Sequence, residues 1–282
     1  MNKPELYSKY SASQRLDNLY VLDNHLDLSR WRAEDVVLDV GSGDGRFSVE
    51  ILMARLPGNF GKFIGCDCSE VMVEFAKKNH RKAKVEFVHF DIAAKVLPED
   101  FEGRFHHIFS FYTLHWVKKQ RKAFENMYKL LKPGGDMLLT FLASNSIFDI
   151  YLNMSKIKKW KPYSKKDYIA PYHGLKHPEK QLEKLMQKIG FVCSLCKVEN
   201  RIFVFHNFDS LRKSVMAINP VIPNLPPEDI PAYMDDFVKE VKNSKQVTIE
   251  NTNNNGEESI KVEYKIFIVS VIKPVNEKGF SV

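Results

Sequence analysis

The chain has 282 residues, of which 44% are hydrophobic and 27% charged, and this is the composition of an ordinary globular protein. It contains no run of about 18 apolar residues, and its first residues lack the apolar core of a signal peptide. We therefore expect no membrane span and a cytoplasmic location. The net charge of +7 suits an anionic partner, but the lysines are spread along the chain, so charge alone selects none.

The four cysteines are Cys66, Cys68, Cys193 and Cys196. In a chain without a secretion signal they are expected to be reduced thiols. Cys193 and Cys196 have C-x-x-C spacing, but no second pair with comparable spacing completes a zinc site. We therefore predict no bound metal.

The first predicted element is a helical leader over residues 1–30. Leucines and tyrosines recur mostly at helical spacing between residues 5 and 28, ahead of the first strand. We expect this leader to pack on the edge of a sheet or across the mouth of a ligand site. Gln14 lies in its middle, where the residues alone indicate only surface polarity.

Residues 36–45 form the pattern around which the chain is organised. The apolar stretch V-V-L-D-V predicts a strand buried on both faces. Gly41, Gly43 and Gly45 then allow a sharp turn and the close approach of a ligand. A helical pattern begins after Gly45. Strand, glycine loop and helix are the first crossover of a doubly wound α/β sheet, whose ligand binds outside the carboxyl end of the strand.

The spacing and charge of this loop favour a ligand that carries positive charge. The dinucleotide fingerprint is G-x-G-x-x-G, whereas the glycines here run G-x-G-x-G. Asp39 lies two residues before the first of these glycines, and Asp44 lies between Gly43 and Gly45. Their carboxylates would repel a pyrophosphate at short range and attract a cation.

Two further predicted strands also end in acids. Residues 62–67 end at Asp67, and residues 85–91 end at Asp91. Together with Asp39 they put three acids at the tips of three successive strands. An acid at the tip of the second strand is positioned to accept hydrogen bonds from ribose hydroxyls, as in dinucleotide folds.

The fourth and fifth strands are predicted at residues 106–112 and 136–141. The loop after the fourth strand carries His115 and Trp116, and a helix then runs to K-P-G-G at residues 132–135.

The remaining sequence adds helices and two more strands. Residues 143–178 are rich in aromatic and apolar side chains, and both a substrate cap and extra core stay open for them. A helix and a strand follow within residues 179–206, and a last strand lies within residues 260–273. Between them, residues 207–243 hold two helical patterns separated by a proline-rich loop. The polar tract at residues 251–258 is predicted to be a disordered hairpin loop.

The string D-V-G-S-G-D-G at residues 39–45, the three acids and K-P-G-G together resemble class I S-adenosylmethionine-dependent methyltransferases. The resemblance runs over residues 36–142. It implies one α/β domain over residues 1–282, with a Rossmann-like seven-stranded sheet, helices on both faces, a cofactor-binding core at 31–142 and a helical substrate lid formed by residues 143–178 and 207–243. The implied cofactor is S-adenosyl-L-methionine, released as S-adenosyl-L-homocysteine. The residues implied to bind it are Asp39, Gly41, Gly43, Asp67, Cys68, Met72, Asp91, Ile92 and Ser110.

Three stretches look like insect juvenile hormone acid O-methyltransferases, which methylate the carboxylate of farnesoic acid or juvenile hormone acid. They are L-Y…S-Q-R-x-D at residues 6–17, S-F-Y-T-L-H-W-V at 110–117, and Q-R-x-A-F-x-N at 120–126. The loop after the fourth strand lacks the N/D-P-P-Y-type sequence of methyltransferases that modify base or glutamine amides. The resemblance therefore implies a small isoprenoid acid as partner and no nucleic acid, and it leaves a homodimer open.

Gln14, His115 and Trp116 are the catalytic residues that this resemblance implies. A carboxylate is ionised at neutral pH, so no general base is needed and catalysis reduces to positioning. Neutral donors suit an anion whose charge is consumed in the transition state. The predicted substrate-binding residues are Tyr151, Met154 and Tyr172.

Two alternatives stay open. A methyltransferase for an aconitate-type acid would call for arginines in the cap, but residues 143–178 contain none. A non-catalytic cofactor- or RNA-binding paralogue is the other, although no RNA-binding aromatic signature and no long basic run supports it.

Overall fold

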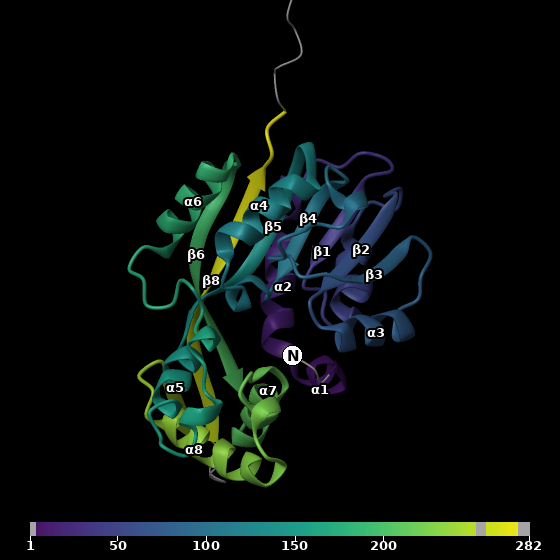
Figure 1. Cartoon of the computed structure of the whole chain (residues 1–282). Helices are drawn as coiled ribbons and strands as arrows, with labels where there is room; N and C mark the ends of the chain where they lie inside the picture. Colours follow the sequence, from purple (N-terminus) through teal and green to yellow (C-terminus); the bar gives the residue numbers. More distant parts are fainter. Residues whose placement is uncertain (1–3, 252–257, 276–282) are drawn as a thin grey trace, which may run out of the picture.

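A β-sheet with strand order β3-β2-β1-β4-β5-β8-β6 runs through the molecule, and β7 pairs with β8 beyond this path (Figure 1). The computed structural model describes residues 4–251 and 258–275. Strands β1 to β5 are mutually parallel, whereas β8 runs antiparallel to β5, β6 and β7. The strands are β1 (Val36–Val40), β2 (Lys62–Asp67), β3 (Val85–His89), β4 (Phe105–Phe111), β5 (Leu131–Asn145), β6 (Val192–Phe205), β7 (Val247–Asn251) and β8 (Glu258–Ile272).

Strand β1 lies at the topological switch point, where the order of the parallel strands reverses. Its side chains from Val37 to Val40 are buried, as the continuous apolar run predicts. Because β2 pairs on one side of β1 and β4 on the other, the loops after β1 and β4 separate and leave a crevice at their carboxyl ends. The predicted doubly wound α/β class is confirmed.

Helices cover both faces of this sheet. One apolar cluster joins Val21 and Leu22 of α2 to β1 and β2, and a second joins Phe124 and Met127 of α4 and Leu182 of α6 to the other face. The helices are α1 (Pro4–Tyr10), α2 (Ala12–His25), α3 (Glu70–Asn79), α4 (Gln120–Leu130), α5 (Ser146–Met154), α6 (Pro178–Ile189), α7 (Phe208–Ile218) and α8 (Ile230–Lys242). No helix in the described ranges is long and apolar enough to span a bilayer.

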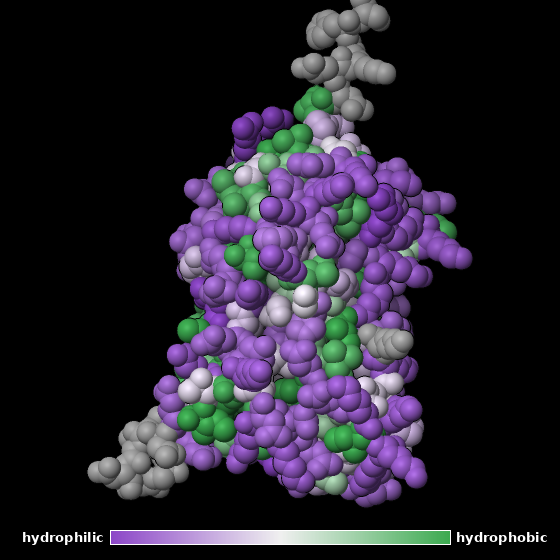
Figure 2. All heavy atoms as spheres, turned by 90° about the vertical axis from the view of Figure 1, so that its left-hand side faces the viewer, coloured by the Kyte–Doolittle hydropathy of each residue, from purple (hydrophilic) through white to green (hydrophobic). Residues whose placement is uncertain are grey.

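Strands β5, β6 and β8 continue past the parallel strands and carry a second layer of helices, α5, α7 and α8, at the lower end of the view in Figure 1. We call residues 146–170 and 207–242 the helical lobe. Its centre is Trp160, which is fully buried, packs edge-on against Tyr233 and donates its indole N–H to Asp236 at 2.9 Å. On the face seen in Figure 2, hydrophilic side chains predominate and apolar ones form separate patches.

The structure departs from the predicted elements in several places. The sheet has an eighth strand, β7. It is only five residues long and three of these residues are polar, so no run of apolar residues indicated it. The helix after the glycine loop is a π-helical turn, Ser48–Leu52, followed by a 3₁₀ turn, Met53–Arg55. Strand β3 ends at His89, so Asp91 lies in the loop beyond it. Most of the polar tract predicted as a disordered hairpin loop lies outside the described residues.

A buried charge cluster holds the amino ends of the central strands together. His107 of β4 is 2% exposed and lies between two carboxylates. Its Nε2 is 2.9 Å from Asp35 before β1, and its Nδ1 is 3.0 Å from Asp136 of β5. The ring of Trp31 packs on the imidazole at 3.9 Å. Burial lowers the pKa of His107, but the hydrogen bonds and charges of Asp136 and Asp35 outweigh it, so the pKa is raised.

Replacement of this residue, His107→Gln, should destabilise the fold most at mildly acidic pH. The imidazolium stabilises the folded state fully below its unfolded pKa near 6.5, and this contribution is lost as pH rises through the raised folded pKa. We expect a loss of about 3 kcal/mol at pH 6, which shrinks as the pH rises. Urea unfolding at a series of pH values measures it.

The exposed His177, which pairs with Glu179 at 3.5 Å, supplies the matched control His177→Gln. This control should cost less than about 1 kcal/mol at every pH. A His107→Gln protein whose stability keeps the pH slope of the original protein would contradict the assignment.

Candidate active site

The glycine loop after β1 is folded against the tip of β2. Gly41 and Gly43 have φ of +78° and +55°, a region that side chains with a Cβ rarely adopt. A Cβ on Gly41 would lie 2.0 Å from the Thr113 hydroxyl oxygen, whereas Gly43 faces more open space. Asp67 accepts hydrogen bonds from the backbone N–H of Gly43 at 3.0 Å and of Ser69 at 2.8 Å. The loop is therefore fixed and leaves its open side at Gly43.

A cavity of about 640 Å³ begins at this open side. It runs from the tips of β1 and β2 to the loop after β4 and to the helical lobe. Residues predicted to contact the cofactor make up its walls on the sheet side: Gly41, Gly43, Asp67, Cys68, Met72 and Asp91. On the lobe side it is closed by Tyr168 and by the turn after α7 around Asn219. We call this space the cofactor cavity.

The other predicted cofactor residues lie behind the cavity wall. Asp39 is buried and accepts a hydrogen bond from the Ser48 hydroxyl at 2.5 Å. Ser110 donates its hydroxyl to the Val40 carbonyl at 2.8 Å. Ile92 is buried, and its carbonyl accepts a hydrogen bond from an Asn126 amide. These three residues support the wall without lining it.

The loop is short of partners for its own polar atoms. Asp44 is 3% exposed, and its Oδ2 has no hydrogen-bond partner among the described residues; the same holds for the hydroxyl of Ser42. Burial raises the pKa of Asp39 to about 7 and also raises the pKa values of Asp44 and Asp67. A nearby cation stabilises the ionised form of buried carboxylates. The residues present therefore fit a ligand with positive charge and hydroxyl groups.

A second, narrower cavity of about 100 Å³ lies between the ends of the long strands and the helical lobe. Its walls are mainly apolar: Ile147, Ile150, Phe203, Phe205, Leu211, Val215, Ile218, Phe237, Val241, Val247 and Val262. Lysine, arginine, aspartate and glutamate are absent from its walls in the ranges that the structure describes. We call it the apolar cavity.

The two cavities meet at the residues predicted to be catalytic. Tyr7, Tyr112 and Trp116 line both of them, and Gln14 and His115 line the apolar cavity at the same place. Gln14 comes from α2, and His115 and Trp116 come from a 3₁₀ turn after β4, so three separate predictions converge in space.

Neighbouring contacts orient two of these polar groups. The amide oxygen of Gln14 accepts a hydrogen bond from the Ser13 hydroxyl at 2.9 Å, which leaves its NH₂ group to donate elsewhere. The Nδ1 atom of His115 accepts the backbone N–H of Leu142 at 3.4 Å, so the ring proton belongs on Nε2. Burial, assisted by the charge of Lys118, lowers the pKa of His115 to about 3. The junction thus offers neutral hydrogen-bond donors.

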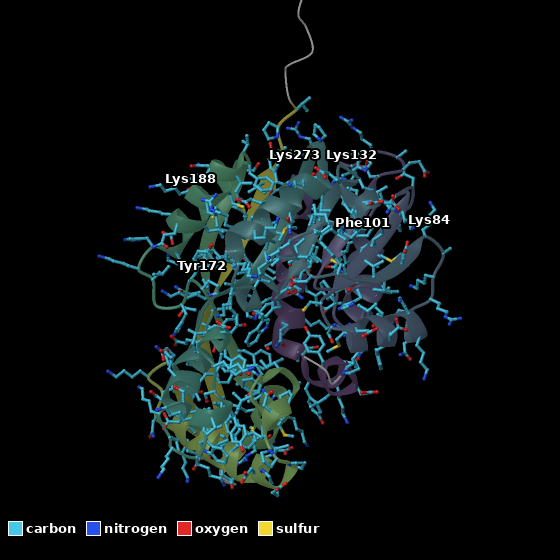
Figure 3. The ribbon with its side chains drawn as sticks, viewed as in Figure 1. Lys84, Phe101, Lys132, Tyr172, Lys188 and Lys273 are labelled. Atoms are coloured by element: carbon cyan, nitrogen blue, oxygen red, sulfur yellow. The ribbon has the colours of Figure 1, made fainter. Side chains whose placement is uncertain are left out.

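The predicted substrate-binding residues Tyr151, Met154 and Tyr172 line neither cavity, and their role stays a prediction. Tyr151 and Met154 are buried in the core of the helical lobe, where Tyr151 packs on Phe237. Tyr172 belongs to the apolar cluster on the other face of the sheet and lies well above the lobe in Figure 3. Core packing and cavity lining require the same apolar side chains, so composition could not separate them.

Sequence reasoning missed Tyr7 and Tyr112 as junction residues. Both lie inside stretches that the resemblance singled out, but aromatic side chains there also fit a packing role. Tyr112 has a φ of +55°, unusual for a residue with a side chain, and this turns it from the strand toward the junction. No sequence pattern announces such a backbone conformation.

The tautomer of His115 can be tested directly. Long-range ¹H–¹⁵N NMR of labelled protein should find His115 neutral, with its proton on Nε2, from pH 8 down to pH 5, because its pKa lies near 3. His115→Gln identifies the signal by its disappearance. A ring that titrates near pH 6.5, or one protonated on Nδ1, would contradict the hydrogen bond from Leu142.

Comparison with known proteins places the chain in a family. A family model described as a methyltransferase domain matches residues 37–135. The juvenile hormone acid O-methyltransferase of Bombyx mori is 36% identical over 274 residues, which cover 96% of each chain. The enzyme of the same name from Drosophila melanogaster is 34% identical and covers 95% of this chain and 91% of its own.

A solved structure shares the fold. The YcgJ protein of Bacillus subtilis superposes with a TM-score of 0.59 at 17% identity, over 90% of this chain and 98% of its own. Together with the two insect relatives, which match nearly end to end, this confirms the resemblance read from the glycine loop, the leader and the His-Trp loop. The chain belongs to the juvenile hormone acid O-methyltransferase family of methyltransferases.

Proposed function

We propose that this protein transfers the methyl group of S-adenosyl-L-methionine to the carboxylate of an apolar isoprenoid acid, of the farnesoic acid or juvenile hormone acid type. The observation that carries the proposal is the junction, where a cavity lined by both acids and lysines meets an uncharged apolar cavity at a set of neutral donors. Family membership supports the same reaction. When bound, the cofactor supplies an electrophilic methyl group and leaves as S-adenosyl-L-homocysteine.

The chain's acids suit that cofactor. Asp67 lines the cofactor cavity at the tip of β2, where an acid accepts hydrogen bonds from ribose hydroxyls. The buried carboxylates of Asp39 and Asp44 supply negative potential for its positive charges. Met72, which lines the cavity, offers an apolar surface to a flat ring, and Asp91 offers an acceptor to an exocyclic amine.

The junction suits a carboxylate nucleophile. The acid is already ionised at neutral pH, so the protein removes no proton. Donors from Gln14, Trp116 and the Nε2–H of neutral His115 can hold the carboxylate so that one oxygen points at the methyl group. During transfer a negative and a positive charge combine, and one C–O bond forms as one C–S bond breaks. Neutral donors therefore cost the reaction less than a tight ion pair would.

The uncharged lining selects for the rest of the substrate. An acid with several carboxylates would leave charges in an apolar cavity without partners, which is strongly unfavourable, so the aconitate-type alternative is disfavoured. An isoprenoid chain gains about 25 cal/mol for each Å² of apolar surface buried. Because the apolar cavity is narrow, it has to widen to admit a long chain. Cytoplasmic location and a homodimer stay predictions.

Methyl-labelled cofactor and a panel of isoprenoid, fatty and tricarboxylic acids test the reaction. We expect a methyl ester from the isoprenoid acids and little or none from the tricarboxylic acids. Gln14→Ala and Trp116→Phe should each lower kcat/KM for the acid by about 10- to 100-fold, since a hydrogen bond to a charged group contributes about 1.5–3 kcal/mol. Cofactor affinity should stay unchanged in both variants.

Gln187→Ala, on the exposed side of α6, is the control for these variants and should keep the original rate. Loss of cofactor affinity at an unchanged rate in either junction variant would show that the assigned roles are wrong. Absence of a methyl ester from every acid in the panel would refute the proposed reaction.

Asp67→Ala tests the cofactor site separately. We expect the dissociation constant for S-adenosyl-L-homocysteine, measured by titration calorimetry, to rise at least about tenfold, because ribose acceptors and the brace on Gly43 are lost together. Asp209→Ala, at an exposed position on α7, should leave the constant unchanged. Equal affinities of Asp67→Ala and the original protein would reject the ribose assignment.

A further inference from the structure

A buried ionic cluster lies beside the junction and has no role in the reaction described above. Asp17 of α2 is 1% exposed and is one helical turn beyond Gln14. Its Oδ1 accepts a hydrogen bond from Nε of Arg201 at 2.8 Å. Its Oδ2 accepts the hydroxyl of Tyr264 at 2.8 Å and that of Tyr112. The cluster therefore joins α2, the end of β4 and the strands β6 and β8.

The cluster borders the apolar cavity from two sides. Tyr112 and Tyr264 line that cavity, and both donate to the same carboxylate oxygen. Arg201 lies on β6 two and four residues before Phe203 and Phe205, which are cavity-lining, so the three share one face of the strand. It also pairs across the sheet with Tyr264. One carboxylate thus links a guanidinium to two tyrosines of the cavity wall.

The guanidinium of Arg201 is held on its far side as well. Its carbon lies 4.2 Å from the centre of the Tyr20 ring, a cation–π distance. The side chain is 25% exposed, whereas that of Asp17 is 2% exposed. Arginine otherwise binds a substrate carboxylate well, because its planar fork matches the two oxygens. Here the guanidinium is bound through its Nε to an internal acid.

We propose that Asp17 is a rate- and specificity-determining residue because it sequesters Arg201, so that the substrate carboxylate meets neutral donors only. The inference rests on the proposed function, since it concerns how that site treats an acid. A free guanidinium at the junction would stabilise the charged reactant, whose charge disappears during methyl transfer, more than the transition state. With Arg201 held by Asp17, the site binds the acid more weakly and turns it over faster than a site with a free guanidinium would.

The experiment compares Asp17→Asn, Arg201→Gln and the double variant. Affinity is measured by calorimetry with S-adenosyl-L-homocysteine present, for farnesoate and for farnesol, an alcohol of the same chain. We expect Asp17→Asn to bind farnesoate at least tenfold more tightly and to turn it over at least tenfold more slowly. Arg201→Gln should bind farnesoate more weakly, because the carboxylate of Asp17 is then uncompensated. Farnesol affinity should change less than threefold in each.

The double variant removes both charges and should return both values to within threefold of the original protein. Arg212→Gln with Asp235→Asn removes an exposed ion pair of the helical lobe and should change neither value. If Asp17→Asn does not fold, the weaker farnesoate binding expected of Arg201→Gln and its recovery in the double variant still decide the matter.

Two outcomes would overturn the inference. One is equal weakening of farnesoate and farnesol in Asp17→Asn without recovery in the double variant, which is the pattern of a purely structural role. The other is an unchanged farnesoate affinity in Arg201→Gln. Failure of the proposed function is distinguishable, because it appears as absence of methyl ester from the original protein, whereas acid-against-alcohol binding still reports on Asp17.

Discussion

Burial of carboxylates at the tips of β1 and β2 is the constraint on which the site depends. Asp39 and Asp44 are each 3% exposed, and the Asp67 carboxylate lies close enough to raise the pKa of Asp39 further. Burial is the main cause of that raised pKa, and the hydrogen bond from Ser48 offsets it only in part. Burying ionised acids in this way costs free energy as long as no cation is bound nearby. It becomes favourable when a ligand brings positive charge to the loop.

The same reasoning explains why the far side of the junction is uncharged. A cation in one cavity and an anion in the other attract each other, and the reaction consumes both charges. A further fixed charge in contact with the substrate carboxylate would stabilise the reactants. This stabilisation would be lost in the transition state, where the two charges combine. Neutral His115, the Gln14 amide and the Trp116 indole avoid this. The only arginine of the adjoining β6 face, Arg201, is paired with Asp17 instead.

The core of the fold was predictable because its signals are local. The apolar run of β1, the glycine spacing, the acid at the tip of β2 and the acid in the loop after β3 follow from neighbouring residues. Gln14, His115 and Trp116 were also identified, but through resemblance; their residue types alone fit a surface amide and a packing pair. Which side chains line the apolar cavity was not predictable. Tyr151 and Phe237 are both buried aromatic residues that pack on each other, yet only Phe237 lines the cavity, because tertiary packing decides that difference.

The leader ahead of β1 connects the two halves of the site. Arg46, just after the glycine loop, donates to the backbone carbonyl of Ser8 at 3.3 Å, which ties α1 to the cofactor side. The same helix packs against α7 of the helical lobe, and in Figure 1 it lies between α7 and α3. Tyr7 extends from α1 into both cavities. A displacement of the lobe would therefore act on α1, which Arg46 ties to the segment after the glycine loop. Helix α1 and its Tyr7 therefore connect the glycine loop, both cavities and the helical lobe.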